Sequence, residues 1–226
     1  MKQAPHAGRR SSRPVFSVCF LLLCVTVLAL LSSCSYGDRK TTHHAKPAPP
    51  PPEPPKEFQP YFDVNLGCPL PLVTNPILYV FKEKRRLLVV DRGILVREYR
   101  VGLGSHPIGD KVMRGDGRTP EGEFFVCVKN PNSRFYKSLG LNYPTPRHAQ
   151  EAMNWGKISQ EQYRKIVDAC SSQSVPPWNT PLGGAIMIHG GGTYADWTEG
   201  CVAVQNSTMD ELFQIVSVGT PVVIMP

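Results

Sequence analysis

Outside its N-terminal segment, the 226-residue sequence has no dense cluster of Lys and Arg with aromatic residues between them. The formal net charge is +7, but residues 1–34 supply four basic residues and no acidic one. The remainder has 21 basic and 18 acidic residues, a net charge of +3. Because nucleic-acid-binding domains concentrate positive charge on one surface, this composition argues against a nucleic-acid partner.

Clustered metal ligands are also missing. A zinc site needs four N or S ligands, or three and a water, and only His189 and Cys201 lie close together in the sequence. His43 and His44 form a pair, but they stand in a proline-rich tract, where solvated histidines are more common than metal ligands. We therefore expect no metal and no cofactor.

Residues 1–34 have the pattern of a signal peptide. Arg9, Arg10 and Arg13 precede an uncharged apolar run, 15–31, which is short for a membrane span. The run ends in Leu-Ser-Ser-Cys at 31–34, which resembles the lipobox of bacterial lipoproteins and implies diacylation of Cys34. An uncleaved signal anchor is the alternative.

Lipidation at Cys34 would place the chain in the bacterial cell envelope, attached to a membrane and facing the periplasm. Ser35 follows the cysteine, which by resemblance to lipoprotein sorting rules favours the outer membrane. Residues 35–60 then form a linker, and 46–60 hold eight of the 23 prolines. An extended polyproline segment of some 25 residues would reach on the order of 80 Å.

Residues 61–226 are long enough for one folded domain with a sizeable core. Short runs rich in Val, Ile, Leu and Tyr, separated by charged or glycine turns, predict strands. They lie at 77–81, 86–91, 94–101, 124–128, 185–188 and 202–204. Asp91-Arg92-Gly93 is a hairpin turn signal.

The close His189/Cys201 pair is the candidate site. His189 ends an apolar run and is followed by three glycines, and Gly200-Cys201 precedes a second short run. We interpret Cys201 as a nucleophile and His189 as its base. On these residues alone, a core histidine beside a buried thiol is nearly as good an interpretation.

Two further motifs precede this pair. Val-Gly-Leu-Gly at 101–104 and Gly-Asp-Gly-Arg-Thr-Pro-Glu-Gly-Glu-Phe at 115–124 stand in order before His189 and Gly200-Cys201. Together they resemble the catalytic domain of the L,D-transpeptidases (YkuD-type) over residues 77–226. The resemblance implies a mainly β fold, a β-sandwich with a cysteine at its mouth and here a helix-containing insert.

The resemblance also implies an activity on peptidoglycan stem peptides. Cys201 would attack the carbonyl of an L-centre joined to D-alanine, and the resulting thioester would pass to an amine acceptor, with an envelope protein as one candidate. Backbone N–H groups at Gly200, Cys201 and the turn that begins at Gly190 are the expected oxyanion donors. Two alternatives are a cysteine hydrolase of the same fold, which cuts stems or protein–peptidoglycan links, and a non-catalytic wall-binding lipoprotein.

Thr198, Trp197, Tyr194 and Asn206 are candidate substrate contacts near the pair. An insert over 129–184 supplies two more, Arg134 and Tyr136, in a predicted loop at 130–136; a solvated Arg and a core Tyr are equally good interpretations. The insert should contain a helix over 159–169, capped by Ser159, and either covers the cleft or only adds packing.

Some positions depart from the common family pattern. Glu199 stands where many members have His before the Gly-Cys pair, and Ala203 stands where Asn or Arg is usual. His189 and Cys201 are also closer in sequence than is common. The branch with Trp-Thr-x-Gly-Cys at 197–201 is a closer match, and hydrolysis of cell-wall linkages also occurs there.

Four cysteines remain in the predicted domain. Cys127 alternates with apolar residues and should be a small buried side chain. A bridge between Cys68 and Cys170 is open, because the sequence gives no evidence for or against it.

Overall fold

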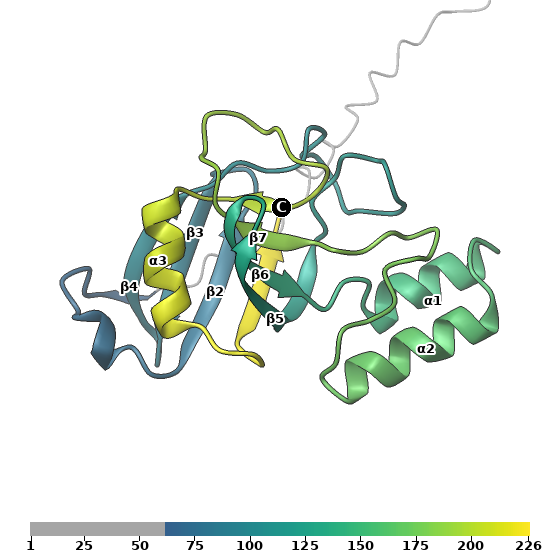
Figure 1. The fold of residues 1–226 in the computed structure, drawn as a ribbon, viewed down its shortest axis with the longest axis horizontal. Helices are drawn as coiled ribbons and strands as arrows, with labels where there is room; N and C mark the ends of the chain where they lie inside the picture. The colour runs from purple at the N-terminus through teal and green to yellow at the C-terminus, as the bar shows by residue number, and fades with distance from the viewer. Residues whose placement is uncertain (1–61) are drawn as a thin grey trace, which may run out of the picture. The chain divides into compact units, whose positions relative to one another are not determined.

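The computed structural model of the protein describes residues 62–226. The predicted signal peptide, Cys34 and the linker at 35–60 lie outside these residues, so these interpretations stay predictions, as do the domain boundaries. The described part is mainly β (Figure 1). Its strands are β1 (Asp63–Val64), β2 (Pro76–Phe81), β3 (Arg86–Asp91), β4 (Ile94–Arg100), β5 (Gly122–Ser133), β6 (Tyr136–Leu141), β7 (Met187–His189), β8 (Val202–Ala203) and β9 (Pro221–Met225). Its helices are the 3-10 turn η1 (Leu70–Leu72), α1 (Pro146–Asn154), α2 (Gln160–Ser171) and α3 (Asn206–Ile215).

Strands β2, β3 and β4 form the predicted antiparallel meander. Alternate residues of β2 are buried, which is the pattern of a strand with one face on the core. Arg92 and Gly93 both have positive φ, the geometry of a tight hairpin turn, so the turn signal is confirmed.

One sheet of nine strands contains both layers of the fold, in the order β1-β4-β3-β2-β9-β5-β6-β7-β8. Strand β5 joins the layers, because its first residues pair with β9 and its later residues pair with β6. Gly102, just after β4, bridges to Ala203 in β8, so the far end of the sheet returns to the first strands. The mainly β fold class is confirmed, with the two layers continuous through β5.

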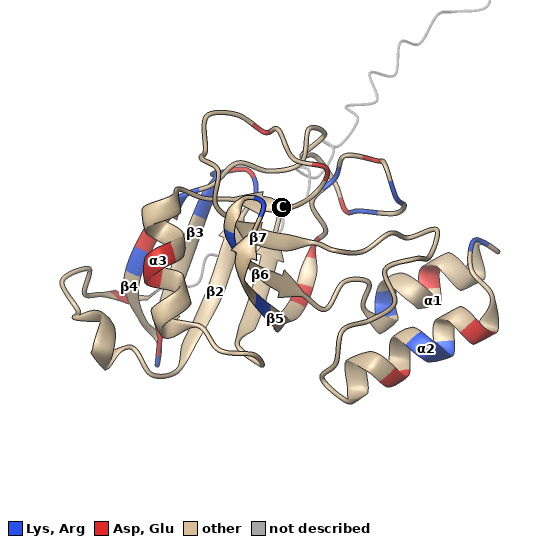
Figure 2. Cartoon of the chain, viewed as in Figure 1, with Lys and Arg blue, Asp and Glu red and all other residues tan. Residues whose placement is uncertain are grey.

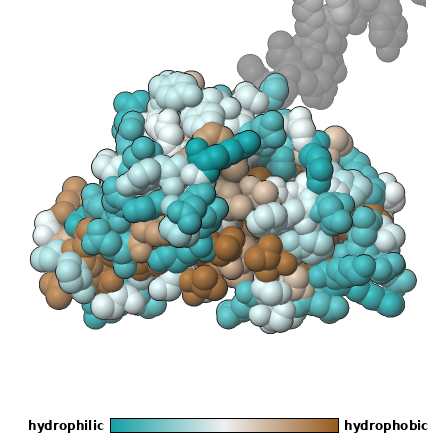
Figure 3. Space-filling model, in the orientation of Figure 1, coloured by the Kyte–Doolittle hydropathy of each residue, from teal (hydrophilic) through white to brown (hydrophobic). Residues whose placement is uncertain are grey.

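The main core gathers side chains from both layers and from α3. Helix α3 packs on the sheet near η1, while α1 and α2 lie together at the other end of the molecule (Figure 1). These two helices have a small core of their own, which includes Ala149, Ile166 and Leu182. Charges of both signs are spread over the elements (Figure 2), and the viewed face is largely hydrophilic, with apolar residues gathered along its lower part (Figure 3).

The insert differs from the prediction. Residues 130–133 continue β5 and Tyr136 begins β6, so the loop predicted at 130–136 is wrong: only Arg134 and Phe135 turn the chain. The helix capped by Ser159 is confirmed, since the Ser159 side chain accepts a hydrogen bond from the Gln162 N–H. Within residues 62–226, no helix combines the length and apolar character needed to cross a bilayer.

Candidate active site

The pairing of β7 with β8 brings the predicted pair into one cavity. The two strands run parallel, with His189 opposite Ala203, and Cys201 immediately precedes β8. The cavity has a volume of about 490 Å³, and both His189 and Cys201 line it. A nucleophile candidate and a base candidate therefore face the same space.

The Cys201 thiol is partly exposed and lies close to the backbone of the segment before β7. Its Sγ accepts a hydrogen bond from the Met187 N–H at 3.4 Å and donates to the Ala185 carbonyl at 3.6 Å. Burial raises the pKa of Cys201, against the opposing effects of the Met187 N–H and the positive charge of Lys111. The resting group is therefore a thiol.

The His189 ring is fixed by a hydrogen bond and by two aromatic neighbours. Its Nδ1 lies 2.6 Å from the Gly190 carbonyl, which can only accept, so Nδ1 carries the proton and Nε2 is left as the basic nitrogen. Phe135 stacks on the ring at 4.6 Å between centroids, and Trp197 meets it edge-on at 5.5 Å. Burial lowers the pKa of His189, so the imidazole is neutral near pH 7.

Two threonines hold the turn that carries the cysteine. Thr198 Oγ1 accepts from the Gly200 N–H at 3.1 Å and donates to the Cys201 carbonyl at 2.7 Å. Thr119 Oγ1 accepts from the Gly104 N–H at 2.9 Å and also lies 3.5 Å from the Cys201 carbonyl. The Thr-Pro motif therefore supports the cysteine from a distant part of the sequence.

Gly200 and Gly104 stand where backbone segments pack directly against each other. Gly200 has φ of 131°, and a Cβ there would lie 2.5 Å from the Arg118 carbonyl oxygen. A Cβ on Gly104 would lie 2.1 Å from the Gly117 carbonyl oxygen. Both positions exclude any side chain, which gives the glycines of the two motifs a physical reason.

The expected oxyanion donors are mostly engaged. Gly200 donates to Thr198, and Gly190 donates to the Lys137 carbonyl. The next two N–H groups of that turn donate to the Asn206 side chain and the Val204 carbonyl. Of the predicted backbone donors in residues 62–226, the Cys201 N–H is the one without an acceptor. The oxyanion roles of Gly200 and Gly190 stay predictions, and both of their N–H groups are hydrogen-bonded within the protein.

The cavity has a basic lining. Lys111, Arg114 and Arg134 contribute positive side chains, and Glu199 contributes the one carboxylate among the described lining residues. Arg134 lies over the Phe135 ring at 4.7 Å. The predicted contacts Trp197 and Thr198 also line the cavity.

Three predicted contacts lie elsewhere. Tyr136 donates its hydroxyl proton to Asp210 and does not line the cavity. Asn206 begins α3, and its side-chain oxygen accepts from the Gly191 N–H, so it positions the turn that holds His189. Tyr194 is 76% exposed and stacks on Trp197 outside the cavity.

The sequence did not point to Phe135, Lys111 or Trp178, although all three line the cavity. Phe135 lies between the two candidate contacts Arg134 and Tyr136, and the hairpin turn at 134–135 places its ring against His189. Trp178, with Gly183 and Gly184, comes from the segment that returns from the helical insert, whereas α1 and α2 themselves do not reach the cavity. The insert thus forms one wall.

The cysteines of the described residues form no disulfide. Cys68, Cys127, Cys170 and Cys201 are all free thiols, and Cys127 is buried as predicted. Across residues 62–226, no group of three or more His, Cys, Asp or Glu side chains is arranged to hold a metal ion.

The sequence profile of the family described as "YkuD: L,D-transpeptidase catalytic domain" matches residues 75–224, about two-thirds of the chain. This chain belongs to the L,D-transpeptidase family. The match contains both glycine-rich motifs, Thr119, His189 and Cys201. It also contains the helical insert, which is therefore an elaboration inside the L,D-transpeptidase domain.

Individual L,D-transpeptidase relatives are more distant. YafK of Escherichia coli (strain K12), provisionally named an L,D-transpeptidase, is 28% identical over 154 residues, which are 65% of this chain and 49% of YafK. The chain thus spans about half the length of the curated relatives it matches. Bd1075 of Bdellovibrio bacteriovorus is similar with a TM-score of 0.45 and 22% identity, over 68% of this chain and 48% of that one. An L,D-transpeptidase from Xylanimonas cellulosilytica is similar with a TM-score of 0.40 and 16% identity, over 67% and 61%.

Proposed function

We propose that this chain is a peptidoglycan L,D-transpeptidase that forms a thioester at Cys201 and transfers the acyl group to an amine. The supporting observation is that the Cys201 thiol and the His189 imidazole line one cavity, with Nδ1 of His189 held by a carbonyl and Nε2 left basic. The substrate class, peptidoglycan stem peptides, is inferred from membership of the L,D-transpeptidase family.

In the proposed first half-reaction, His189 Nε2 takes the Cys201 proton as Sγ attacks the stem-peptide carbonyl. The tetrahedral oxyanion accepts a hydrogen bond from the Cys201 N–H. The C–N bond then breaks, the imidazolium returns its proton to the leaving amine, and the thioester remains. In the second half-reaction an acceptor amine attacks the thioester, gives its proton to Nε2 and releases the thiol.

Both groups are neutral at rest, because burial acts on their two pKa values in opposite directions. The thiol of Cys201 is protonated and the imidazole of His189 is free to accept a proton. This arrangement favours proton transfer during attack over a preformed thiolate–imidazolium pair.

Hydrolysis is the second candidate function, and Glu199 is the observation in its favour. This exposed carboxylate lines the cavity beside Cys201, at a position where many family members have His. A carboxylate beside the thioester can take the proton of an attacking water, so Glu199 would act as the general base of hydrolysis. The products would be cut stems or released protein–peptidoglycan links.

The deciding experiment incubates the described domain with tetrapeptide muropeptides, with and without an amine acceptor. Transpeptidase activity predicts release of D-alanine and a new amide product only with the amine present. Free tripeptide as the main product in both reactions would favour the hydrolase instead. Cys201→Ala should abolish either reaction and the acyl-enzyme mass, whereas Cys127→Ala, which removes a buried thiol outside the cavity, should preserve them. Absence of any thioester in wild type would overturn both candidates.

We also propose that the chain is lipidated at Cys34 and held at the periplasmic side of the outer membrane, with the proline-rich segment as a tether. The support is the sequence at 31–35 and the composition of 46–60. Labelling of cells with radioactive palmitate, followed by membrane fractionation, should show label in wild type and none in Cys34→Ala. Equal labelling of both would contradict the proposal. Envelope proteins with accessible amines are then candidate acceptors.

A further inference from the structure

Three lysines of the domain donate hydrogen bonds from ammonium groups that are partly or fully buried, and they differ in how many acceptors surround them. An ammonium group has three N–H donors, and buried donors are almost always paired. Lys82 Nζ donates to the Gly109 carbonyl at 2.6 Å, to the Thr119 carbonyl at 3.0 Å and to the Glu121 carboxylate at 2.6 Å. All three N–H donors of Lys82 are therefore paired within the protein, so Lys82 has a structural role.

Lys129 is also well supplied. Its ammonium donates to the carbonyls of Phe213 at 2.8 Å and Val216 at 2.6 Å, at the end of α3. The Phe213 ring lies 4.8 Å away and contributes a third favourable contact. Lys129 thus holds the end of the helix.

Lys111 is different. Its residue is only 4% exposed, yet within residues 62–226 its ammonium has one acceptor, Asp116 Oδ1 at 2.6 Å. Two of its three N–H donors have no acceptor among the described residues. Lys111 lines the cavity that contains Cys201, so these donors belong to the candidate active site.

Lys111 is held at both ends, the ammonium by Asp116 and the backbone N–H by Asp110. Asp116 is fixed by the N–H groups of Val112, Met113 and Arg118 at 2.8–3.1 Å, and these bonds with Lys111 keep the pKa of Asp116 low despite burial. The backbone of Lys111 is fixed separately, because its N–H donates to Asp110 Oδ1 at 2.7 Å.

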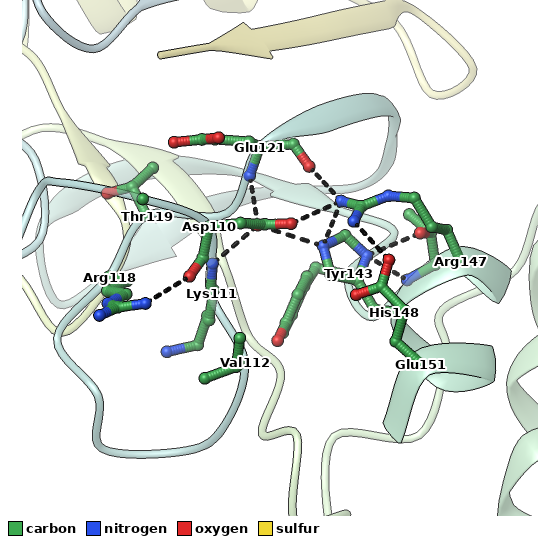
Figure 4. Close-up of polar contacts among 12 residues, drawn as sticks. Asp110, Lys111, Val112, Arg118, Thr119, Glu121, Tyr143, Arg147, His148 and Glu151 are labelled. Atoms are coloured by element: carbon green, nitrogen blue, oxygen red, sulfur yellow. Dashed lines mark hydrogen bonds and ion pairs between the residues drawn. The ribbon is translucent and has the colours of Figure 1, made fainter. Parts of the chain in front are cut away.

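Asp110 in turn is anchored to the helical insert. It also accepts from the Glu121 N–H at 2.8 Å and from Arg147 at 2.7 Å, and it lies 3.4 Å from the buried His148 ring. Figure 4 shows Asp110 at the centre of this cluster and the Lys111 side chain leading away from it. Lys111 is therefore positioned in advance, which reduces the entropy that a ligand must lose on binding.

We infer that Lys111 is a substrate-binding residue that holds the free C-terminal carboxylate of the donor peptide. A terminal carboxylate matches two free donors of a buried ammonium, and the residue that leaves carries this group close to the scissile carbonyl. Arg114 and Arg134 also line the cavity, but both are exposed and Arg114 donates to the Trp178 carbonyl. The identity of this anion rests on the proposed function.

The first test needs no peptide turnover. Iodoacetate carries a carboxylate and iodoacetamide does not, so the ratio of their rates of Cys201 alkylation reports an anion-binding group beside the thiol. Lys111→Gln should lower this ratio by about tenfold, the order expected for one close charge pair, and Lys111→Arg should restore most of it. Lys137→Gln is the control, because it removes a half-buried lysine that pairs with Asp210 outside the cavity. A ratio that is equal in wild type and Lys111→Gln would overturn the inference.

Lys111→Gln leaves Asp116 without its cation, so the double variant Lys111→Gln/Asp116→Asn provides a second measurement with no net charge change at the pair. It should lower the alkylation ratio as the single variant does, while thermal unfolding verifies the fold. An unchanged ratio in a folded double variant counts against Lys111.

The second test uses the donor itself. Wild type should favour a stem that ends in D-alanine over the same stem ending in D-alaninamide, and Lys111→Gln should lose this preference mainly through KM. Turnover with an unchanged preference would refute the inference and leave the proposed function intact. A Lys111-dependent alkylation ratio without any turnover would support an anion site at Lys111 but contradict the proposed function, and with it the donor peptide as the anion.

Discussion

The two layers of the sheet are stabilised in different ways. Strands β2, β3 and β4 have six or seven residues each, and backbone ladders join them along their length, with one register shift between Val89 and Val90 of β3. In the layer with the site, β7 has three residues and β8 has two, and side chains of Thr198, Thr119 and Asn206 hold the adjoining turns. Both layers contribute side chains to the core, but the turns that carry the site depend on a few bonds between side chains and backbone. Substitutions in the two layers should therefore have separable effects.

Replacement of the proposed nucleophile should give the largest effect on activity and almost none on stability. Cys201→Ala removes the group that would form the proposed thioester, so we expect a loss in kcat of about 10⁴-fold or more. The thiol makes only long contacts at 3.4 and 3.6 Å, so the unfolding midpoint should hardly move. Muropeptide turnover and thermal denaturation measure the two. Residual turnover near the wild-type rate would assign the chemistry to another residue.

Truncation in the first layer should have the opposite effect. Leu78 in β2 is fully buried in the main core, and Leu78→Ala should reduce the free energy of unfolding by about 2–5 kcal/mol. At temperatures well below the melting point, kcat/KM should stay near the wild-type value, because Leu78 does not line the cavity and makes none of the side-chain bonds that hold the turns of the site. Denaturant titration and steady-state kinetics provide the comparison. A large fall in kcat/KM of the folded variant would show that the two layers are not independent.

An isosteric change at the cysteine turn should affect both properties moderately. Thr198→Val keeps the shape but leaves the Gly200 N–H and the Cys201 carbonyl without this partner, at a cost of about 1–3 kcal/mol. Because the same bonds orient Cys201, kcat/KM should also fall by about tenfold or more. Thr220→Val is the matched control: Thr220 is equally buried, accepts from the Ser217 N–H and lies before β9. It should lose stability without losing activity, and Thr198→Ser should recover the activity.

The smallest predicted effect is in the pH profile. Burial lowers the pKa of His189 below its ordinary value of 6.5, so the neutral base persists to more acidic pH. The acid limb of kcat/KM should accordingly fall below pH 6.5. Phe135→Ala opens one face of the ring to water and should move the limb upward, toward 6.5. An acid limb above 6.5 in wild type would contradict this account.

The difference between the layers also explains what the sequence could predict. The strands at 77–81, 86–91 and 94–101 are set by local hydrophobic periodicity and by the turn residues between them. The helix cap is set by the Ser159 side chain itself. All of these can be predicted from short stretches of sequence. Helix α3 was missed although Thr208, Met209, Leu212 and Ile215 give it an apolar face, which a search at helical spacing would have found.

The missing parts of the site depend on partners far away in the sequence. Nothing near Lys111 shows that this residue lines the cavity of Cys201, and nothing near Asn206 shows that its side chain holds the Gly191 N–H. The family resemblance pointed to His189 and Cys201 as the candidate pair. It could not show that the Gly200 and Gly190 N–H groups are already engaged, because hydrogen-bond partners are a property of the folded chain.

The last strand occupies a central place in the sheet. β9 runs parallel to β2 and antiparallel to β5, so it lies between the two layers although it is the last strand of the described chain. During synthesis or export, β2 and β5 must wait for residues 221–225 before they acquire their shared neighbour. A chain cut short before Pro221 would present two unpaired strand edges, the features from which aggregation starts. Residues 221–225 are therefore an integral part of the sheet, since their removal would expose edges of both β2 and β5.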